Sequence, residues 1–309
     1  MPAALTGLQM HPLIIGKHTL PWGERTYVMG ILNLTPDSFS GDGLFVPSTF
    51  PSSFSPEEEQ PGMKEARRFL AAGVDILDIG GESTRPGSQP VEAEEELHRV
   101  LPTLRAIAAG FPDALISIDT YKAVVAEEAL KAGAAIVNDI WGLRADPDLA
   151  RVVAQYQAAV VLMHNRSKPA NVEVRERLGK AYLGAEYQDL LEDVKRELQE
   201  SVAIAHSAGI PDERIILDPG LGFGKTVGQN LELINRLDEI RALGFPVLLG
   251  PSRKSFIGYT LNLPPDQRLE GSAASVAIGI ARGADIVRVH DVEPIQRVAH
   301  MTDAIVRHK

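Results

Sequence analysis

Three polar residues, Asp119, Asn138 and Asp218, each follow a short apolar run of the sequence, and long stretches of helical pattern separate these runs. Side chains alternate along a strand, so about half of such residues face any one side of a sheet. Two carboxylates and an amide can accept several N–H donors and return one. If the three converge, they suit a polar nitrogen heterocycle.

A single Asp at a strand end has a simpler interpretation, which is the N-cap of the next helix. Asp119 fits that role best, because helix-like sequence follows it directly. The three residues together with basic partners favour a binding site instead.

Basic residues follow the last two apolar runs of the chain. Ser252-Arg253-Lys254-Ser255 follows one of them, and Arg288-x-His290 ends the other. In a parallel barrel this region commonly holds a phosphate. Bonds from a cation to a phosphate contribute about 1.5–3 kcal/mol each, so two or three can hold a diphosphate. We expect an anion site here, with solvated cations as the alternative.

Two nucleotide-binding patterns fail at residues 219–225, PGLGFGK. A P-loop requires Gly where Pro219 stands, and the dinucleotide fingerprint requires Gly where Lys225 stands. The three glycines of this segment therefore predict a tight turn and close backbone approach beside a flat ligand. His164 has no paired metal-ligand spacing, and we expect a core or rim histidine there.

Eight short apolar runs alternate with helical patterns long enough to return the chain parallel to the previous strand. The runs are 28–33, 74–79, 115–118, 135–138, 159–163, 214–217, 247–249 and 286–289. The intervening helical stretches include 91–109, 122–132, 185–208, 229–243 and 271–282. Eight such units predict an α/β (β/α)8 barrel, with a doubly wound sheet as the alternative. Residues 13–25 predict a β-hairpin that plugs the N-terminal end of the barrel, and 40–61 a mobile Ser/Pro-rich loop.

Composition limits the class of protein. The chain has 309 residues, 44% hydrophobic residues and a formal net charge of −10, which is the wrong sign for a nucleic-acid binder. It has no Cys, which excludes disulfides, thiolate metal sites and a Cys nucleophile. No long apolar run indicates a membrane protein, and the first residues do not resemble a secretion signal, so a cytoplasmic location is expected.

Seven motifs occur in one order along the chain: MGILNLTPDSFS (29–40), DIGGESTRPG (78–87), SIDT (117–120), NDI (138–140), LDPGLGFGK (217–225), SRKS (252–255) and RVHD (288–291). Together they resemble the dihydropteroate synthase family. The resemblance implies one (β/α)8 domain over residues 1–309. It also implies a reaction that joins 6-hydroxymethyl-7,8-dihydropterin diphosphate to p-aminobenzoate and releases pyrophosphate, with Mg²⁺ and a homodimer.

The same resemblance implies the site residues. The pterin would be held by Asp119, Asn138, Asp218 and Lys254, and the diphosphate by Asn33, Arg288 and His290, with Asn33 also on Mg²⁺. Thr84 and Arg85 would border the substrates, Ser255 would help to receive p-aminobenzoate, and Phe223 is also implied as substrate-binding. The catalytic residues would be Asp119, Lys254, Arg288 and His290.

One motif departs from the family. Members usually carry Asp directly after the second Ser of the first motif, whereas this chain reads Ser40-Gly41-Asp42-Gly43, and the insertion that follows is longer than usual. Two alternatives remain open. A pterin-dependent methyltransferase needs no grip on a diphosphate, so the SRKS and RVHD motifs disfavour it. A pterin-binding relative without activity is suggested only by the altered loop.

Overall fold

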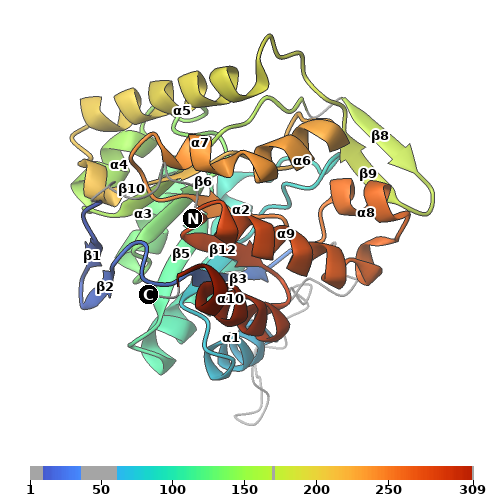
Figure 1. Cartoon of the computed structure of the whole chain (residues 1–309). Helices are drawn as coiled ribbons and strands as arrows, with labels where there is room; N and C mark the ends of the chain where they lie inside the picture. The colour runs from blue at the N-terminus through green and yellow to red at the C-terminus, as the bar shows by residue number, and fades with distance from the viewer. Residues whose placement is uncertain (1–9, 36–60, 169–170, 308–309) are drawn as a thin grey trace.

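The computed structural model describes residues 10–35, 61–168 and 171–307, and it has a cylinder of parallel strands surrounded by helices (Figure 1). The strands of the cylinder are β3 (Tyr27–Asn33), β4 (Ile76–Gly80), β5 (Leu115–Asp119), β6 (Ile136–Asp139), β7 (Ala159–Met163), β10 (Ile215–Asp218), β11 (Leu248–Leu249) and β12 (Ile286–Val289). Each predicted apolar run overlaps one of them, with bounds that differ by at most two residues. The predicted strands are therefore confirmed.

The sheet closes on itself. Its hydrogen-bonded order is β10-β7-β6-β5-β4-β3-β12-β11, and its neighbouring strands pair in parallel. Leu217 of β10 forms a parallel bridge to Val247, next to β11, and its N–H donates to the Pro246 carbonyl at 2.9 Å. Because this contact joins the two ends of the sheet, the fold is the (β/α)8 barrel and not the doubly wound sheet.

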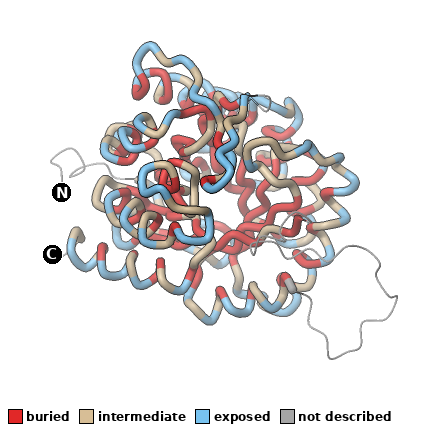
Figure 2. The backbone as a smooth tube through the Cα atoms, turned by 90° about the vertical axis from the view of Figure 1, so that its right-hand side faces the viewer, coloured by how far each residue is buried: buried red, intermediate tan, exposed pale blue. Residues whose placement is uncertain are grey.

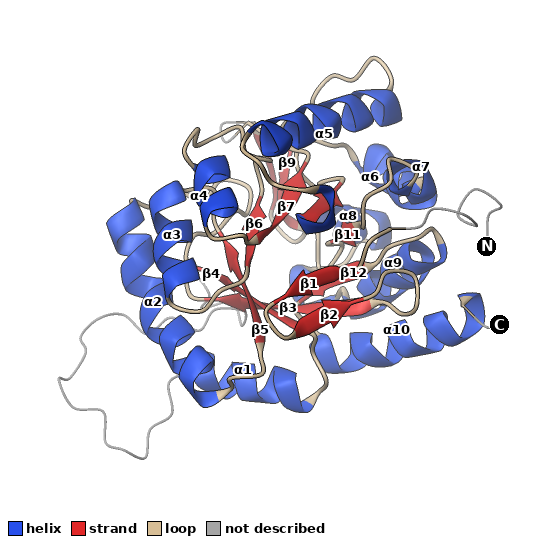
Figure 3. Ribbon diagram, turned by 90° about the vertical axis from the view of Figure 1, so that its left-hand side faces the viewer, coloured by secondary structure: helices blue, strands red, loops and turns tan. Residues whose placement is uncertain are grey.

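Helices cover the outside of the cylinder (Figure 3). They are α1 (Pro61–Ala71), α2 (Ala93–Gly110), α3 (Ala123–Lys131), α4 (Leu149–Gln155), α5 (Leu190–Ser207), α6 (Val227–Asn235), α7 (Leu237–Arg241), α8 (Ser255–Leu261), α9 (Leu269–Ala281) and α10 (Val292–Val306). Two helical stretches differ from prediction by more than two residues or by a break. The stretch 229–243 is divided into α6 and α7 at Arg236, where φ is −115°. The stretch 185–208 begins its helix only at Leu190, because extended Asp189 caps it by accepting the Glu192 N–H.

The predicted N-terminal hairpin is present and lies at one end of the barrel (Figure 3). Strand β1 (Leu13–Ile15) pairs antiparallel with β2 (His18–Leu20), and Leu13 stands opposite Leu20. Leu13, Ile15 and Leu20 are buried in one cluster with inward-facing strand residues such as Met29 and Ile76. The hairpin therefore plugs the N-terminal end of the barrel, as predicted.

A second apolar layer lies between the strands and the helices. Val28 and Leu32 of β3 belong to it, whereas Met29 of the same strand faces the interior, as the alternation of side chains requires. Figure 2 shows buried backbone concentrated at the centre of the molecule and exposed backbone around it. The predicted loop 40–61 lies outside the described residues except for Pro61, which begins α1.

Within the described part of the chain, the helices are too short or too polar to span a bilayer.

Candidate functional site

An arginine joins two carboxylates at the mouth of the barrel. Arg288 on β12 donates from Nε to Oδ2 of Asp78 on β4 and from Nη2 to Oδ2 of Asp119 on β5, both at 2.6 Å. Asn138 on β6 donates to the same Asp78 oxygen at 3.0 Å. Four strands therefore bring their polar residues together at the carboxyl end of the cylinder, where barrel enzymes carry their active sites.

Burial has a large effect on the protonation of Asp119 and Arg288. It raises the pKa of Asp119 to about 7, against the opposing effect of Arg288. Burial alone would lower the pKa of Arg288, but the carboxylates of Asp78 and Asp119 outweigh it, so the pKa is raised and the guanidinium stays charged. The other oxygen of Asp78, Oδ1, is buried and has no hydrogen-bond partner among the described residues.

The same geometry excludes the simpler interpretation of Asp119. Helix α3 begins at Ala123, and the residue at its N-cap position is Lys122, which makes no side-chain cap. The N–H of Ala123 donates instead to Asp146 Oδ2 at 2.8 Å. Asp119 is bound to Arg288 and caps nothing, so the N-cap alternative is wrong.

Asp218 and Lys254 belong to the same mouth. Burial raises the pKa of Asp218, and the nearby charge of Lys254 opposes that effect. Burial also lowers the pKa of Lys254 to about 8, although the carboxylates of Asp218 and Asp119 act against it. Asp218 Oδ1 accepts the Gly220 N–H at 2.7 Å. The structure thus brings together the acidic and basic residues that the sequence predicted to converge.

Lys254 also reaches the glycine segment that follows β10. Its Nζ lies 4.6 Å from the centre of the Phe223 ring and donates to the Leu221 carbonyl. Ser255, the next residue, begins α8. The predicted residues Phe223, Lys254 and Ser255 therefore lie close to one another.

The predicted basic residues near the last two strands are present, but His290 is uncharged and Arg253 is paired with a carboxylate. Burial lowers the pKa of His290 to about 3, with Arg288 and Arg253 adding to the effect, so this histidine is neutral. Its Nδ1 lies 3.0 Å from Ser252 Oγ. Arg253 is paired with Asp291, at 2.9 and 2.6 Å.

The remaining predicted residues lie on the first two strands and the loop after β4. Asn33 ends β3, stands opposite Gly80 of β4 and is partly exposed. Thr84 is partly exposed, and its carbonyl accepts the Tyr182 hydroxyl at 3.3 Å. Arg85 is exposed in the same loop. The described residues contain no group of three His, Asp or Glu side chains arranged to hold a metal ion.

The glycine segment forms the predicted tight turn, because Gly220, Gly222 and Gly224 have φ of +71°, +83° and +68°. The close approach that the structure shows is to the protein's own backbone. A Cβ at Gly220 would collide with the His164 carbonyl oxygen, and one at Gly224 would lie 2.6 Å from the carbonyl carbon of Arg166. These glycines let the turn pack against the segment that follows β7.

Lys225 stabilises the glycine turn through hydrogen bonds of its ammonium group. Its Nζ donates to the carbonyls of Gly220 and Phe223 at 2.8 and 3.1 Å and to His164 Nδ1 at 3.0 Å. His164 is buried, and its Nε2 lies 3.0 Å from Glu197 Oε2. The expectation of a core histidine is confirmed.

Asp78 and Lys225 are site residues that sequence reasoning did not select. A signal for Asp78 existed. Leu77 and Ile79 are apolar and pack against the helices, so the alternation of β4 turns Asp78 inward. For Lys225 the only signal was its position in the dinucleotide fingerprint, where that pattern requires Gly.

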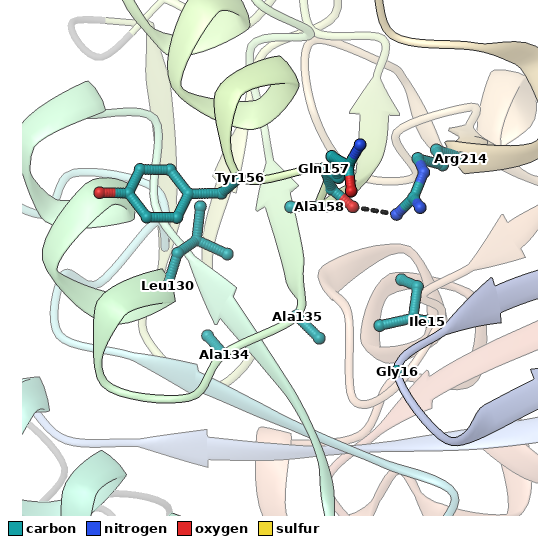
Figure 4. A pocket seen from close by; sticks show the side chains of 9 residues that line it. All are labelled: Ile15, Gly16, Leu130, Ala134, Ala135, Tyr156, Gln157, Ala158 and Arg214. Carbon is teal, nitrogen blue, oxygen red and sulfur yellow. Dashed lines mark hydrogen bonds between the residues drawn. The ribbon is translucent and has the colours of Figure 1, made fainter.

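A separate hollow of about 220 Å³ lies at the opposite end of the barrel (Figure 4). It is lined by Ile15 and Gly16 of the hairpin and by residues of neighbouring loops, including Tyr156 and Gln157, whose carbonyl accepts from Arg214. In this fold the N-terminal face contributes to stability and the carboxyl end to chemistry. The hollow is therefore not part of the candidate site.

Comparisons with known proteins agree with this geometry. Residues 29–290 match the family described as pterin binding enzyme. The dihydropteroate synthase of Clostridium beijerinckii is 49% identical, over 95% of this chain and 99% of its own length. The Yersinia pestis dihydropteroate synthase, solved with a sulfonamide drug complex, has a TM-score of 0.83 and 38% identity, covering 95% of this chain and 98% of that one. The Xanthomonas albilineans dihydropteroate synthase, solved with 4-aminobenzoic acid, has a TM-score of 0.80 and 35% identity, covering 96% and 98%. The chain therefore belongs to the dihydropteroate synthases, which are transferases of the pterin-binding enzyme family.

Proposed function

We propose that this chain joins 6-hydroxymethyl-7,8-dihydropterin diphosphate to p-aminobenzoate through the residues at the carboxyl end of its barrel. The observation that carries the proposal is the bond pattern of Arg288, which lies between Asp78 and Asp119 at the mouth. It sets a permanent cation directly beside a group of buried acceptors. The buried acceptors suit the N–H groups of a nitrogen-rich ring, and the cation suits the phosphorylated arm of that ring.

The pterin binds among Asp119, Asn138 and Asp218. Buried carboxylates and an amide reject analogues that lack the matching N–H groups, by factors of roughly 10⁴ to 10⁵. The unpartnered Oδ1 of Asp78 supplies a further acceptor. Lys254, which interacts with both Asp119 and Asp218, gives the same ring a donor.

The diphosphate binds to Arg288, His290 and Asn33. Two N–H groups of Arg288 are used by carboxylates, and a guanidinium has others that can donate to phosphate oxygens. The carboxylates thus hold the arginine in place before the anion arrives. His290 is neutral because burial lowers its pKa and the charges of Arg288 and Arg253 add to that effect, and a bound anion would raise its pKa and allow it to donate.

The reaction depends on the departure of the leaving group, because an aryl amine is a weak nucleophile. Arg288 and His290 stabilise the charge that grows on the departing diphosphate oxygen, and their fixed position means that little reorganisation is needed. The Asp119 carboxylate stabilises positive charge that develops on the pterin. The aminobenzoate then attacks the exocyclic carbon, with its ring near Phe223 and Ser255 and with Thr84 and Arg85 at the border of the site.

Mg²⁺ fits this site only together with the substrate. The described residues offer Asn33 as one oxygen ligand and no cluster of carboxylates. Mg²⁺ is commonly bound by one or two protein oxygens plus substrate phosphates, so the donor set is suitable once a diphosphate is present. When bound, the ion supplies further neutralisation of the diphosphate charge.

Three broader properties are also proposals. We infer that residues 1–309 act as one domain and assemble as a homodimer. Exposed apolar side chains on α9 and α10 support the dimer, and they include Ile278, Met301 and Ile305. We infer a cytoplasmic location because a dihydropterin diphosphate is too strongly charged to cross a bilayer unaided.

The decisive experiment measures pyrophosphate release by the purified chain. Release that requires both p-aminobenzoate and Mg²⁺ is the expected result. Methyl transfer to a corrinoid without pyrophosphate release would favour the methyltransferase alternative, and pterin binding without turnover would favour the relative without activity.

A further inference from the structure

An antiparallel hairpin interrupts the connection between β7 and α5. Its strands, β8 (Val172–Arg175) and β9 (Gly179–Tyr182), pair from Val172 with Tyr182 to Arg175 with Gly179. The connection leaves the carboxyl end of β7, so it belongs to the face on which barrel enzymes bind substrates. In Figure 1 the hairpin projects from the barrel next to α8, with which β9 is in contact.

The hairpin is fixed to the segment that carries the predicted anion site. Arg268 is buried, and it donates to the Leu178 carbonyl at the tip of the hairpin at 2.7 Å and to the Arg253 carbonyl at 2.9 Å. The Tyr259 hydroxyl of α8 donates to the Gly179 carbonyl at 3.4 Å. A buried guanidinium with carbonyl partners on both segments holds them together, because losing either partner would leave a buried donor unpaired.

Tyr182, the last residue of β9, connects three parts of the mouth. Its hydroxyl donates to the carbonyl of Thr84 in the loop after β4. Its ring centre lies 6.0 Å from that of Phe223 in the glycine turn, with 32° between the ring planes. Lys254 lies over the same Phe223 ring. The phenol is partly buried, so one part of it remains accessible.

Resting on the proposed function, we propose that Tyr182 determines specificity for the aromatic amine substrate. Tyr182 and Phe223 form one apolar wall of the slot that takes the benzene ring of p-aminobenzoate. The hydroxyl of Tyr182 also holds Thr84, and thereby the loop that borders the slot, at a fixed distance from this wall.

The chemistry of the wall matches a benzoate. Two aromatic rings at this distance and tilt bury a third ring favourably, and each aromatic pair contributes beyond its buried area. The Lys254 ammonium beside Phe223 and the Ser255 hydroxyl at the start of α8 suit the anionic end of the substrate. Tyr182 itself lies on the hairpin and not on the strands that carry Asp119, Asn138 and Asp218, so a change at Tyr182 should act mainly on the second substrate.

Two variants test the contributions of the Tyr182 ring and the Tyr182 hydroxyl separately. Tyr182→Leu keeps apolar bulk and loses the ring, and we expect the KM for p-aminobenzoate to rise about 10-fold. Tyr182→Phe keeps the ring and loses the hydrogen bonds of the hydroxyl, to the Thr84 carbonyl and to Ser167, so a rise of about 3-fold is expected. The KM for the dihydropterin diphosphate should stay within about 2-fold of the wild-type value, because only the aromatic slot has changed.

A second readout distinguishes specificity from mere structural support. The ratio of kcat/KM for p-aminobenzoate to kcat/KM for 4-amino-3-methylbenzoate is measured in each variant. Tyr182→Leu widens the slot, so the ratio should fall by about 10-fold in favour of the methylated ring. A purely structural role would lower both values equally and leave the ratio unchanged, which would overturn the proposal.

Matched controls lie elsewhere in the chain. Tyr156→Leu changes a tyrosine at the opposite end of the barrel, and Val174→Ala changes an exposed residue of the same hairpin. Both variants should keep the wild-type kcat and KM values.

Inactive wild-type protein would contradict the proposed function only. The wall of Tyr182 and Phe223 would then be tested by calorimetry of p-aminobenzoate binding in the presence of pterin and pyrophosphate. Equal affinity of wild type and Tyr182→Leu in that measurement would overturn the inference.

Discussion

The guanidinium of Arg288 is held by two carboxylates before any ligand arrives. Asp78 and Asp119 both accept from it at 2.6 Å, and both carboxylates are buried. Buried charges are costly unless they are paired, so these three residues stabilise one another. The arrangement also fixes the arginine in the place where leaving-group charge is expected to develop.

We predict that Arg288→Ala lowers turnover about 10²–10³-fold but weakens binding of a dihydropterin without diphosphate much less. The arginine acts on the leaving group, whereas the ring is recognised by the acceptors. Steady-state kinetics and calorimetry measure the two effects separately. Arg297→Ala, on the exposed side of α10, is the control, and thermal unfolding checks that both variants fold. Equal losses in turnover and in ring binding would remove the assignment of Arg288.

His164 makes a prediction about pH. Burial, together with the Lys225 charge, lowers its pKa from 6.5 to about 4 in the folded protein. Between pH 6.5 and about pH 4, His164 is protonated in the unfolded chain and neutral in the native state. The stabilising contribution is therefore complete above pH 6.5 and is lost as the pH falls toward 4, by up to about 1.4 kcal/mol per pH unit.

The variant His164→Asn retains an acceptor for Lys225 but cannot take up this proton. We expect its free energy of unfolding to fall less steeply than that of the wild type between pH 6.5 and pH 5, as measured by urea unfolding. Identical slopes for wild type and His164→Asn would show that folding does not lower the pKa of His164.

At the scale of elements, the glycine turn after β10 is held by the segment after β7. Gly220 has φ of +71°, and a Cβ there would strike the His164 carbonyl oxygen. Gly209 is a matched control, because it has φ of +90° but nothing within 4 Å of a Cβ. Gly220→Ala should destabilise the protein by at least about 2 kcal/mol more than Gly209→Ala in denaturant unfolding, since only the former adds a clash to the backbone strain. Similar losses would mean that the turn moves freely.

The barrel elements could be predicted from the sequence because each strand is a short apolar run with its own periodicity. The division of helix 229–243 could not, since both halves share one apolar pattern and the break is visible only in the backbone of Arg236, where φ is −115°. The β8–β9 hairpin carried a weak signal, the alternation of Val172-Glu-Val-Arg175, but its position depends on contacts with Arg268 and α8, which are distant in sequence.

At the scale of the whole molecule, the site could be predicted as a set of residues but not as a set of bonds. Asp119, Asn138 and Asp218 were recognisable from their places at strand ends. Which carboxylate binds Arg288 depends on the order of strands around the closed barrel, where β12 lies beside β3 and not beside β4 or β5. The sequence pattern does not show how far Arg288 on β12 lies from the carboxylates of β4 and β5, and so Asp78 was not selected.

The closed barrel also separates stability from chemistry, because the hairpin β1–β2 fills the end opposite to Arg288. Leu13 of the hairpin is fully buried, whereas its neighbour Ile14 is 57% exposed. Leu13→Ala should lower the free energy of unfolding by about 2–5 kcal/mol through loss of buried apolar surface and creation of a cavity, while Ile14→Ala should change it by less than about 0.5 kcal/mol. Denaturant unfolding measures both. Because the carboxyl ends of the strands are held by their own hydrogen-bond network, kcat and both KM values of folded Leu13→Ala should equal those of the wild type. A selective loss of kcat in that variant would show that the two ends of the barrel are coupled.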